Sequence, residues 1–458
     1  MERDPAVAVL DVGKSNVKLA LVDLASRAVV AIRTTGNAVL RDGPYPHSDV
    51  ERIWTWMLEG LAVLRDRAEI VAITATTHGA AFALLAGDRL ALPVLDYEHD
   101  GPETVREAYS AARGSFSEIL SPDLPNGLNA GRQLFWLARA FPDRFAMVDT
   151  VLPYPQYWVW RLSGEKVAEM TSLGCHTDMW NPRVGTYSRL AAAEGWVRLF
   201  PRLAKPWEVV GRLRRELAAE TGLSPDTRII AGIHDSNASL YPHLVERKLP
   251  FAVLSTGTWM IFLSPGGSLD KLDPNRDCLA NVDAFGRAVP SARFMAGREF
   301  AILAGEAPVE PAAADIARVV GEGIMALPSF APGTGPYPMK KGRWTHEPAA
   351  LSSEERSAVA SLYSALVADT SLRLAGADGP TIVEGPFARN RLFLSATASL
   401  TGRAVIARPD ATGTTDGAAL LALGPAARPE AHLDPAPAAP LEINLSAYAA
   451  KWRELAGS

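Results

Sequence analysis

One local pattern occurs twice in the chain, and it restricts the fold more than any other feature of the sequence. Residues 8–23 read AVLDVGKSNVKLALVD and residues 252–265 read AVLSTGTWMIFLSP. Each segment has an apolar strand, a small polar turn that contains glycine, and a second apolar strand, which is typical of a β-hairpin. We interpret the recurrence as a structural duplication. It predicts two related domains that face a cleft, with a boundary near residues 226–230.

The elements expected around the two hairpins indicate an α/β fold. Apolar residues recur at helical spacing over residues 50–68, and residues 352–375 predict a long helix. Two strands joined by a polar glycine turn are expected at 70–74 and 80–85, and further strands at 228–233 and 381–384. The mixture of strands and helices is that of an α/β protein. The length of 458 residues corresponds to two or three domains, at roughly 100–200 residues each.

Composition excludes several classes of protein. Hydrophobic residues make up 48% and charged residues 21% of the chain, as in an ordinary globular protein. The net charge of −5 gives no basic field for nucleic acid. Cys175 and Cys278 are too few for a disulfide framework or a cysteine-rich zinc site. Two uncharged stretches, residues 70–87 and 250–269, are each interrupted by a polar glycine turn and so do not read as membrane helices. The apolar N-terminal run is too short for a signal peptide. We expect a cytoplasmic protein without nucleic-acid or membrane partners; a homodimer is left open.

Two familiar nucleotide-binding motifs are missing. Gly13-Lys14-Ser15 resembles the end of a P-loop, but that motif needs glycine at position 8, where the chain has Ala8. Gly13 also opens a hairpin rather than a helix. No G-x-G-x-x-G follows a predicted strand, so a nicotinamide-dependent oxidoreductase is disfavoured.

The turns of the two hairpins are candidate phosphate sites. Asp11 ends a buried strand beside Gly13, so its carboxylate lies next to free backbone N–H groups that can bind phosphate. The carboxylate itself can hold Mg²⁺. Thr256-Gly257-Thr258 occupies the matching place in the second hairpin. The alternative for both is an ordinary hairpin turn, capped in the first by its own aspartate.

A third candidate follows the strand expected at 228–233. Asp235 comes directly after it, and a carboxylate placed there can act as general base toward a sugar hydroxyl. The alternative is a helix-capping carboxylate, with His234 as a structural histidine. Two further polar segments, 76–79 and 96–100, could face the same cavity, or could be a self-satisfied turn and a solvated loop.

Five segments together resemble a known family. DVGKSNVKLALVD, HDSNASLYP, STGTW, GPFARNRLF and TTDGAALLAL occur in this order and resemble the FGGY carbohydrate kinases, which belong to the actin-like ATPase group. The resemblance runs from about residue 6 to 424 and implies an α/β fold of two actin-like (ribonuclease H-like) ATPase domains flanking a cleft. It implies a sugar-binding domain over residues 1–228 and a nucleotide-binding domain over 229–458. The His234-Asp235 pair is most similar to the rhamnulokinase and fuculokinase branch.

The resemblance also implies an activity and a set of site residues. The activity is transfer of the γ-phosphoryl group of ATP to a hydroxyl of a ketose, with Asp235 as catalytic base and Mg²⁺ held near Asp11 and Asp235. The residues implied to contact the sugar are Thr77, His78, Glu98, Asp100 and His234. Those implied to contact the nucleotide are Asp11, Gly13, Lys14, Ser15, Thr256, Gly257, Thr258, Gly385, Ala388, Asn390 and Gly417.

Lys14 departs from the family pattern, which has Thr or Ser after the glycine of the first turn. Its side chain could add a charge at the phosphates or point away along the surface. Two other functions stay open: a kinase of a polyol or sugar acid, and a non-catalytic actin-like sugar sensor. The presence of both Asp11 and Asp235 argues against the sensor, which has no need of a base.

Overall fold

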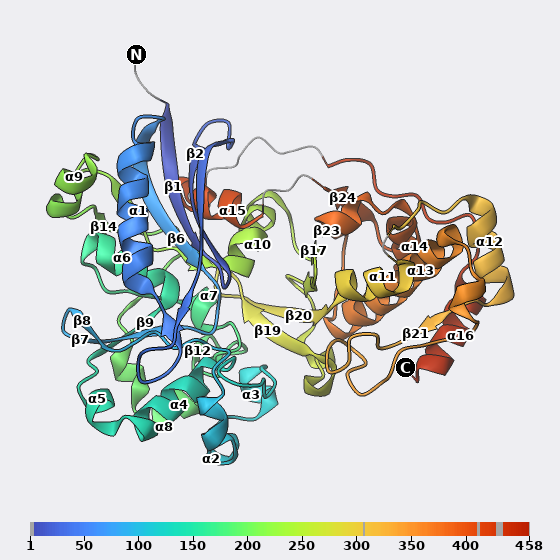
Figure 1. The fold of residues 1–458 in the computed structure, drawn as a ribbon, viewed down its shortest axis with the longest axis horizontal. Helices are drawn as coiled ribbons and strands as arrows, with labels where there is room; N and C mark the ends of the chain where they lie inside the picture. The colour runs from blue at the N-terminus through green and yellow to red at the C-terminus, as the bar shows by residue number, and fades with distance from the viewer. Residues whose placement is uncertain (1–3, 306, 410–412, 427–433, 458) are drawn as a thin grey trace. The chain divides into compact units, whose positions relative to one another are not determined.

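The chain divides into two units, each built on one mixed sheet covered by helices (Figure 1). The computed structural model describes residues 4–305, 307–409, 413–426 and 434–457. Unit 1 comprises residues 1–247, 281–288 and 412–431, and unit 2 comprises 248–280, 289–411 and 432–458. In the described part of the chain, no helix is both long and apolar enough to cross a membrane.

The main sheet of unit 1 contains the first predicted hairpin. Strands β1 (Pro5–Val12) and β2 (Asn16–Asp23) pair antiparallel, and β3 (Val29–Gly36) continues the sheet beyond β2. On the other side of β1 lies β6 (Glu69–Thr77), which runs parallel to it. Strands β15 (Arg228–Ile230) and β16 (Ile233–His234) both pair parallel with β6, and β14 (Val209–Arg212) forms the edge.

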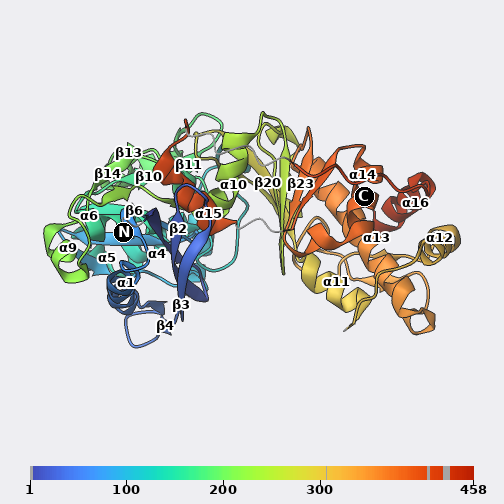
Figure 2. The same ribbon diagram turned by 90° about the horizontal axis from the view of Figure 1, so that it is seen from above.

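Residues of β1 alternate between two helical layers. Ala6, Ala8 and Leu10 pack in one core with helices α1 (Val50–Leu64), α6 (Tyr154–Ser163) and α9 (Arg215–Thr221). Val7 and Val9 pack in a second core with α10 (Asp235–Glu246) and α15 (Thr414–Leu420), which lie side by side in Figure 2. Because side chains alternate along a strand, a strand covered on both faces is apolar throughout. This explains the continuous apolar run that marks the first hairpin.

A smaller sheet with its own core completes unit 1. Its order is β8 (Arg89–Leu92), β7 (Phe82–Ala86) and β9 (Thr150–Pro153), beside α2 (Arg106–Ala112) and α4 (Ala130–Ala140). The strands expected at 70–74 and 80–85 therefore belong to different sheets, because β7 pairs with the distant β9 rather than with β6. The short elements are β4 Val39–Leu40, β5 His47–Ser48, β10 Ala168–Glu169, β11 Trp180–Asn181, β12 Thr186–Tyr187, β13 Leu203–Ala204, α3 Phe116–Ile119, α5 Pro142–Ala146, α7 Met170–Leu173, α8 Arg189–Ala193, and the 3₁₀ helices Gly101–Val105, Trp196–Leu199 and Leu421–Leu423.

Unit 2 repeats the strand order of unit 1. Its hairpin, β17 (Ala252–Thr256) and β18 (Met260–Leu263), lies between antiparallel β20 (Ala288–Phe294) and parallel β23 (Thr381–Glu384), with β24 (Val405–Arg408) beyond. The corresponding order in unit 1 is β3-β2-β1-β6-β15. The shared order of two antiparallel and two parallel pairings confirms the duplication.

The helices of unit 2 gather on one face of its sheet. Figure 2 shows α11 (Ala296–Ala304), α13 (Ser353–Leu374) and α14 (Arg391–Thr401) there. Helix α13 confirms the long helix expected at 352–375; it begins after Ser352, whose hydroxyl accepts from the Glu355 N–H in a capping box. The remaining elements are β19 Cys278–Val282, β21 Ala326–Leu327, β22 Arg343–Trp344, α12 Ala313–Glu322, α16 Ser446–Ala456, and the 3₁₀ helices Leu269–Lys271, Pro274–Arg276, Pro348–Ala350 and Pro386–Arg389.

Candidate active site

Three parallel strands of unit 1 end at the same edge of its sheet. Val12 of β1 is in register with Thr77 at the end of β6, and His234 of β16 is in register with Thr77 as well. The carboxyl ends of parallel strands are where ligands bind in open α/β sheets. The register therefore gathers four of the sequence-predicted site residues and the candidate base at one place; they are Asp11, Thr77, His78, His234 and Asp235.

Asp235 opens helix α10 at this edge. Its Oδ1 accepts hydrogen bonds from the Ser236 N–H at 2.5 Å and the Ser236 hydroxyl at 3.2 Å, which leaves Oδ2 for a ligand. About a third of the side chain (31%) is exposed. Burial raises the pKa of the Asp235 carboxyl, and the neighbouring His78 opposes that rise. An accessible carboxylate with a raised pKa is suited to accept a proton near neutral pH.

His234 is buried and neutral beside this carboxylate. Its Nε2 lies 3.1 Å from Asp235 Oδ1 and 3.4 Å from Cys175 Sγ, and its Nδ1 lies 3.4 Å from the Asn237 amide nitrogen. Burial lowers the pKa of His234 to about 4. An amide nitrogen only donates, so it matches an Nδ1 acceptor and places the ring proton on Nε2, toward Asp235. His234 is thus buried from solvent and contacts the candidate base Asp235.

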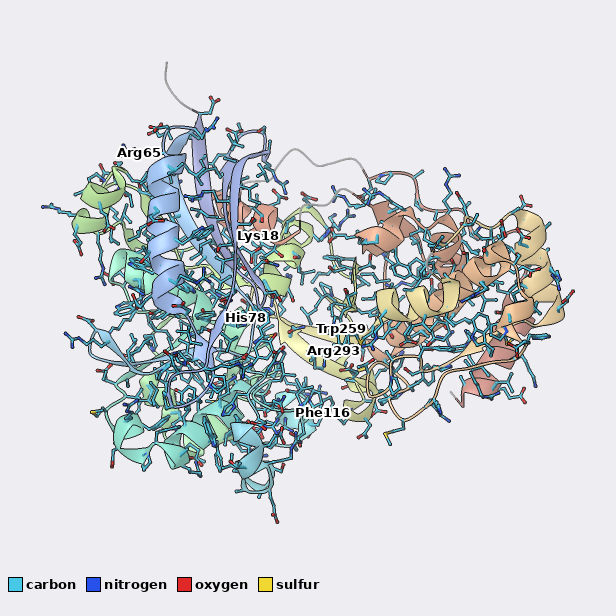
Figure 3. The ribbon with its side chains drawn as sticks, viewed as in Figure 1. Lys18, Arg65, His78, Phe116, Trp259 and Arg293 are labelled. Carbon is cyan, nitrogen blue, oxygen red and sulfur yellow. The ribbon has the colours of Figure 1, made fainter. Side chains whose placement is uncertain are left out.

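His78 follows β6 and is labelled in Figure 3. Its Nδ1 donates to the Gly79 carbonyl at 2.8 Å, and its ring lies 5.4 Å from the Tyr97 ring and 5.3 Å from the Tyr154 ring. Burial lowers the pKa of His78. A neutral imidazole that donates through Nδ1 keeps Nε2 as an acceptor for a hydroxyl. The Thr77 hydroxyl donates to the His78 carbonyl at 2.9 Å, so it supports this histidine.

Asp11 is buried in β1 opposite Lys18 of β2, which Figure 3 labels. Lys18 Nζ lies 3.5 Å from Asp11 Oδ2. Burial raises the pKa of Asp11, and the neighbouring negative charge of Asp235 raises it further. Two carboxylates that repel each other in this way form a place for a hard cation. Mg²⁺ uses one or two carboxylates together with substrate phosphates, so Asp11 and Asp235 fit it.

Lys18 was not among the residues predicted from the motifs. The hairpin register could have found it, because pairing outward from the Gly13-Lys14-Ser15 turn puts residue 12 opposite 17 and residue 11 opposite 18. The Gly13 N–H donates to the Asn16 carbonyl at 2.9 Å and closes this turn.

Lys14 turns toward the segment that follows β8. Its ammonium group pairs with Asp96, lies 3.4 Å from Glu98 Oε2, and sits 4.8 Å from the centre of the Tyr97 ring. Through Lys14, Glu98 is linked to the same edge of the sheet as His78. Asp100 is placed differently, because its side chain is 87% exposed and its carboxylate lies 3.4 Å from His99 Nδ1.

Glu169 is a further buried carboxylate linked to this edge, which sequence reasoning missed. It accepts hydrogen bonds from the Thr171 N–H at 2.9 Å and from the Thr171 hydroxyl, whose oxygen accepts from the His234 N–H at 3.1 Å. The Glu169 carboxylate thus directs the hydroxyl proton of Thr171 and holds the chain where β16 passes into α10. Burial raises the pKa of Glu169 to about 7.

We expect Glu169 to make the stability of unit 1 fall as pH rises. Its pKa increases from 4.5 to about 7 on folding, so the folded protein binds more protons between these values and the free energy of unfolding decreases through that window. In Glu169→Gln this decrease should be smaller by about 3 kcal/mol. Denaturant titrations from pH 4.5 to 7.5 measure it, with Glu216→Gln, a change at an exposed residue of α9, as the control. Parallel profiles of Glu169→Gln and wild type would contradict the expectation.

Unit 2 carries the second hairpin turn next to a pocket of about 790 Å³. The pocket is lined by Gly257, Thr258 and Asn390 of the predicted set. Its apolar wall includes Phe300 and Phe387, whose rings lie 5.5 Å apart. Cations at the pocket come from Arg298, Arg389 and Arg391. Aromatic surface beside arginines suits a flat base attached to phosphates. Near the turn, the Arg293 guanidinium lies 4.9 Å from the Trp259 ring centre (Figure 3).

The other predicted nucleotide residues of unit 2 shape this region. Gly385 has φ +77°, and a Cβ there would lie 2.1 Å from the Thr256 carbonyl oxygen, so only glycine fits. The Thr256 hydroxyl donates to the Glu384 carbonyl and accepts from the Phe387 N–H at 3.1 Å. Asn390 caps α14 by accepting from the Phe393 N–H at 2.9 Å. Ala388 is buried in the turn between β23 and α14.

Gly417, which the motifs grouped with these residues, lies in unit 1 within α15. A Cβ at Gly417 would lie 1.8 Å from the Ala238 carbonyl oxygen of α10. Gly417 therefore allows helices α15 and α10 to pack closely against each other.

Comparison with known proteins places the chain among carbohydrate kinases. The model of the FGGY family of carbohydrate kinases, N-terminal domain, matches residues 6–241. The model of the carbohydrate kinase FGGY C-terminal domain matches residues 248–431. The chain therefore belongs to the FGGY family, and the two-domain, actin-like fold expected from the motifs is confirmed.

Individual relatives agree with this assignment. A solved carbohydrate kinase from Novosphingobium aromaticivorans is 37% identical with a TM-score of 0.91, and the match covers 100% of this chain and 99% of that one. The L-fuculokinase of Salmonella typhi is 26% identical, over 59% of this chain and 58% of the relative. The rhamnulokinase of Halalkalibacterium halodurans is 24% identical, over 55% and 52%. The matched segment thus spans little more than half the length of these curated relatives.

Proposed function

We propose that this protein is an ATP-dependent carbohydrate kinase that phosphorylates a hydroxyl of a ketose or a related sugar. In this proposal unit 1 binds the acceptor and carries the general base, and unit 2 binds the nucleotide. The observation that carries it is Asp235, a partly exposed carboxylate of raised pKa. It stands beside Asp11 and His78 at the carboxyl ends of three parallel strands.

The chemistry follows from the groups at this edge. The acceptor hydroxyl donates its hydrogen bond to Asp235 and loses its proton to that carboxylate as its oxygen bonds to the γ-phosphorus. The bond from the γ-phosphorus to the bridging oxygen of ADP breaks. Such transfers depend on positioning and charge stabilisation. His78 Nε2 can accept from a neighbouring hydroxyl, and neutral His234 keeps Asp235 in place without protonating it.

The charge developing on the phosphates needs cations. Mg²⁺, bound through Asp11 and Asp235, would supply the larger part of that stabilisation. Lys18, which pairs with Asp11, is a fixed positive charge at the same turn. In unit 2 the pocket beside Gly257 and Thr258 offers an aromatic wall for adenine.

The test is release of ADP from MgATP with a panel of candidate acceptors. The panel includes L-fuculose, L-rhamnulose and L-xylulose, chosen from the names of the relatives, with alditols and sugar acids. ADP release that requires one acceptor supports the proposal. ATP binding without ADP release for any acceptor would contradict it and favour a sugar sensor.

A further inference from the structure

Lys14 stands in the turn expected to bind phosphate, yet its charge is directed elsewhere. Its ammonium group pairs with buried Asp96 and lies 3.4 Å from Glu98. The Tyr97 ring beneath it packs against the His78 ring at 5.4 Å. Burial raises the pKa of Tyr97 to about 12, and the negative charges of Glu98, Asp96 and Asp235 add to that rise. Lys14 and Asp235 also act on His78, so these groups are electrostatic neighbours.

An acceptor must lie among these groups if Asp235 is its base. Proton transfer requires the reacting hydroxyl within about 3 Å of a carboxylate oxygen. The rest of a small sugar then extends along His78 and Tyr97 toward Lys14. A lysine paired with carboxylates still has donor capacity, and the carboxylates have free lone pairs. Together they can hold two neighbouring hydroxyls of one sugar.

The charges at this end of the site are unfavourable for an anion. Asp96 and Glu98 together carry more negative charge than Lys14 neutralises. Lys18 is paired with Asp11. A carboxylate-bearing acceptor would therefore meet net negative charge from unit 1.

From this arrangement, and resting on the proposed kinase function, we propose that Lys14 is an acceptor-specificity residue. With Asp96 and Glu98 it selects a neutral polyhydroxyl acceptor over a sugar acid. Its contribution is to the sugar end of the site rather than to the phosphates of ATP.

The first experiment compares matched acceptors. Wild-type protein should use neutral ketoses or alditols with a kcat/KM at least about tenfold above that for aldonates of the same chain length, a factor equal to about 1.4 kcal/mol. Glu98→Lys reverses the charge of a side chain that is 64% exposed. It should lower the ratio of kcat/KM for neutral acceptors to kcat/KM for aldonates at least threefold. Glu107→Lys, on an exposed site of α2, makes the same change in net charge and should leave the ratio unaltered. A wild-type preference for aldonates, or equal effects of both variants, would overturn the proposal.

The second experiment tests whether Lys14 acts on the sugar or on the phosphates of ATP. Lys14→Met should raise the KM for the acceptor about tenfold and leave the KM for ATP within about twofold, as loss of one or two hydrogen bonds predicts. Because this variant leaves Asp96 buried without its partner, Lys14→Met/Asp96→Asn is measured beside it and should show the same division. A raised KM for ATP with an unchanged KM for the acceptor would instead place Lys14 on the phosphates.

Calorimetric titration of ketoses and aldonates without nucleotide keeps this inference distinct from the kinase proposal. If no acceptor is phosphorylated, the kinase proposal fails, while tighter binding of neutral acceptors still supports the role of Lys14. Equal or absent binding of both classes overturns that role.

Discussion

Asp235→Asn is expected to lower kcat by about 10²–10⁴-fold, the usual contribution of a general base. The amide has the size of the carboxylate and can keep the contacts with Ser236, but it cannot accept the proton of the acceptor hydroxyl. The KM for the acceptor and the binding of ATP measured without Mg²⁺ should change little. Steady-state ADP release at saturating acceptor measures the loss, and calorimetry measures the Kd for ATP.

The control for this variant is Asp226→Asn, which removes an 81% exposed carboxylate of the same unit and should leave kcat unchanged. The pH profile adds a second check. Asp235 accepts a proton only while it is ionised, and its pKa is raised. Wild-type kcat/KM should therefore fall as the pH drops through that pKa. The residual activity of Asp235→Asn should lack this step. Turnover of Asp235→Asn within fivefold of wild type would refute the assignment of the base.

Gly417→Ala is expected to produce the largest loss of stability among the single changes considered. The added Cβ would lie 1.8 Å from the Ala238 carbonyl oxygen, which is fixed backbone of α10, so helix α15 has to move. Overpacking of this kind costs about 1–3 kcal/mol, and we expect the upper end. For a unit of this size that is a fall in Tm of about 6–12 °C.

Gly321→Ala is the matched control, because it is also a change inside a helix. Gly321 lies in α12, and a Cβ there would meet nothing within 4 Å. Its replacement should stabilise unit 2 by about 0.5–1 kcal/mol through helix propensity. Scanning calorimetry of both variants separates the effects. An unchanged Tm for Gly417→Ala would mean that α10 and α15 are not packed as closely as described.

Local patterns in the sequence were sufficient for much of the fold. Both hairpins and the long helix α13 were predicted because strand alternation, turn chemistry and capping are properties of neighbouring residues. Strands β6 and β7 were both predicted, but the pairing of β7 with β9 was not, because β9 lies more than sixty residues further along the chain. Such pairings depend on packing between distant segments, which no local pattern contains.

In the candidate site, too, local patterns predicted some residues, while contacts between distant segments determined the rest. Asp11 and Asp235 were found from their places at strand ends, but their proximity comes from the parallel register of β1, β6 and β16. Glu169 was missed because its link to His234 passes through the Thr171 hydroxyl, from another part of the chain. The close packing of Gly417 against α10 could not be predicted, because the sequence shows a glycine but not the helix that lies against it.

The chain enters unit 1 in three separate segments, and the late position of the last of them has a consequence for biosynthesis. Helix α15 covers the face of the sheet formed by Val7 and Val9, and Arg27 binds both Asp416 of α15 and Glu246 of α10. A nascent chain emerges N-terminus first, so this face is covered only in part, by α10, until nearly all of unit 2 has been translated. The first-made sheet is thus the last to be covered completely, and a premature stop before α15 would release a protein with a partly open apolar face, a substrate for chaperones and proteases.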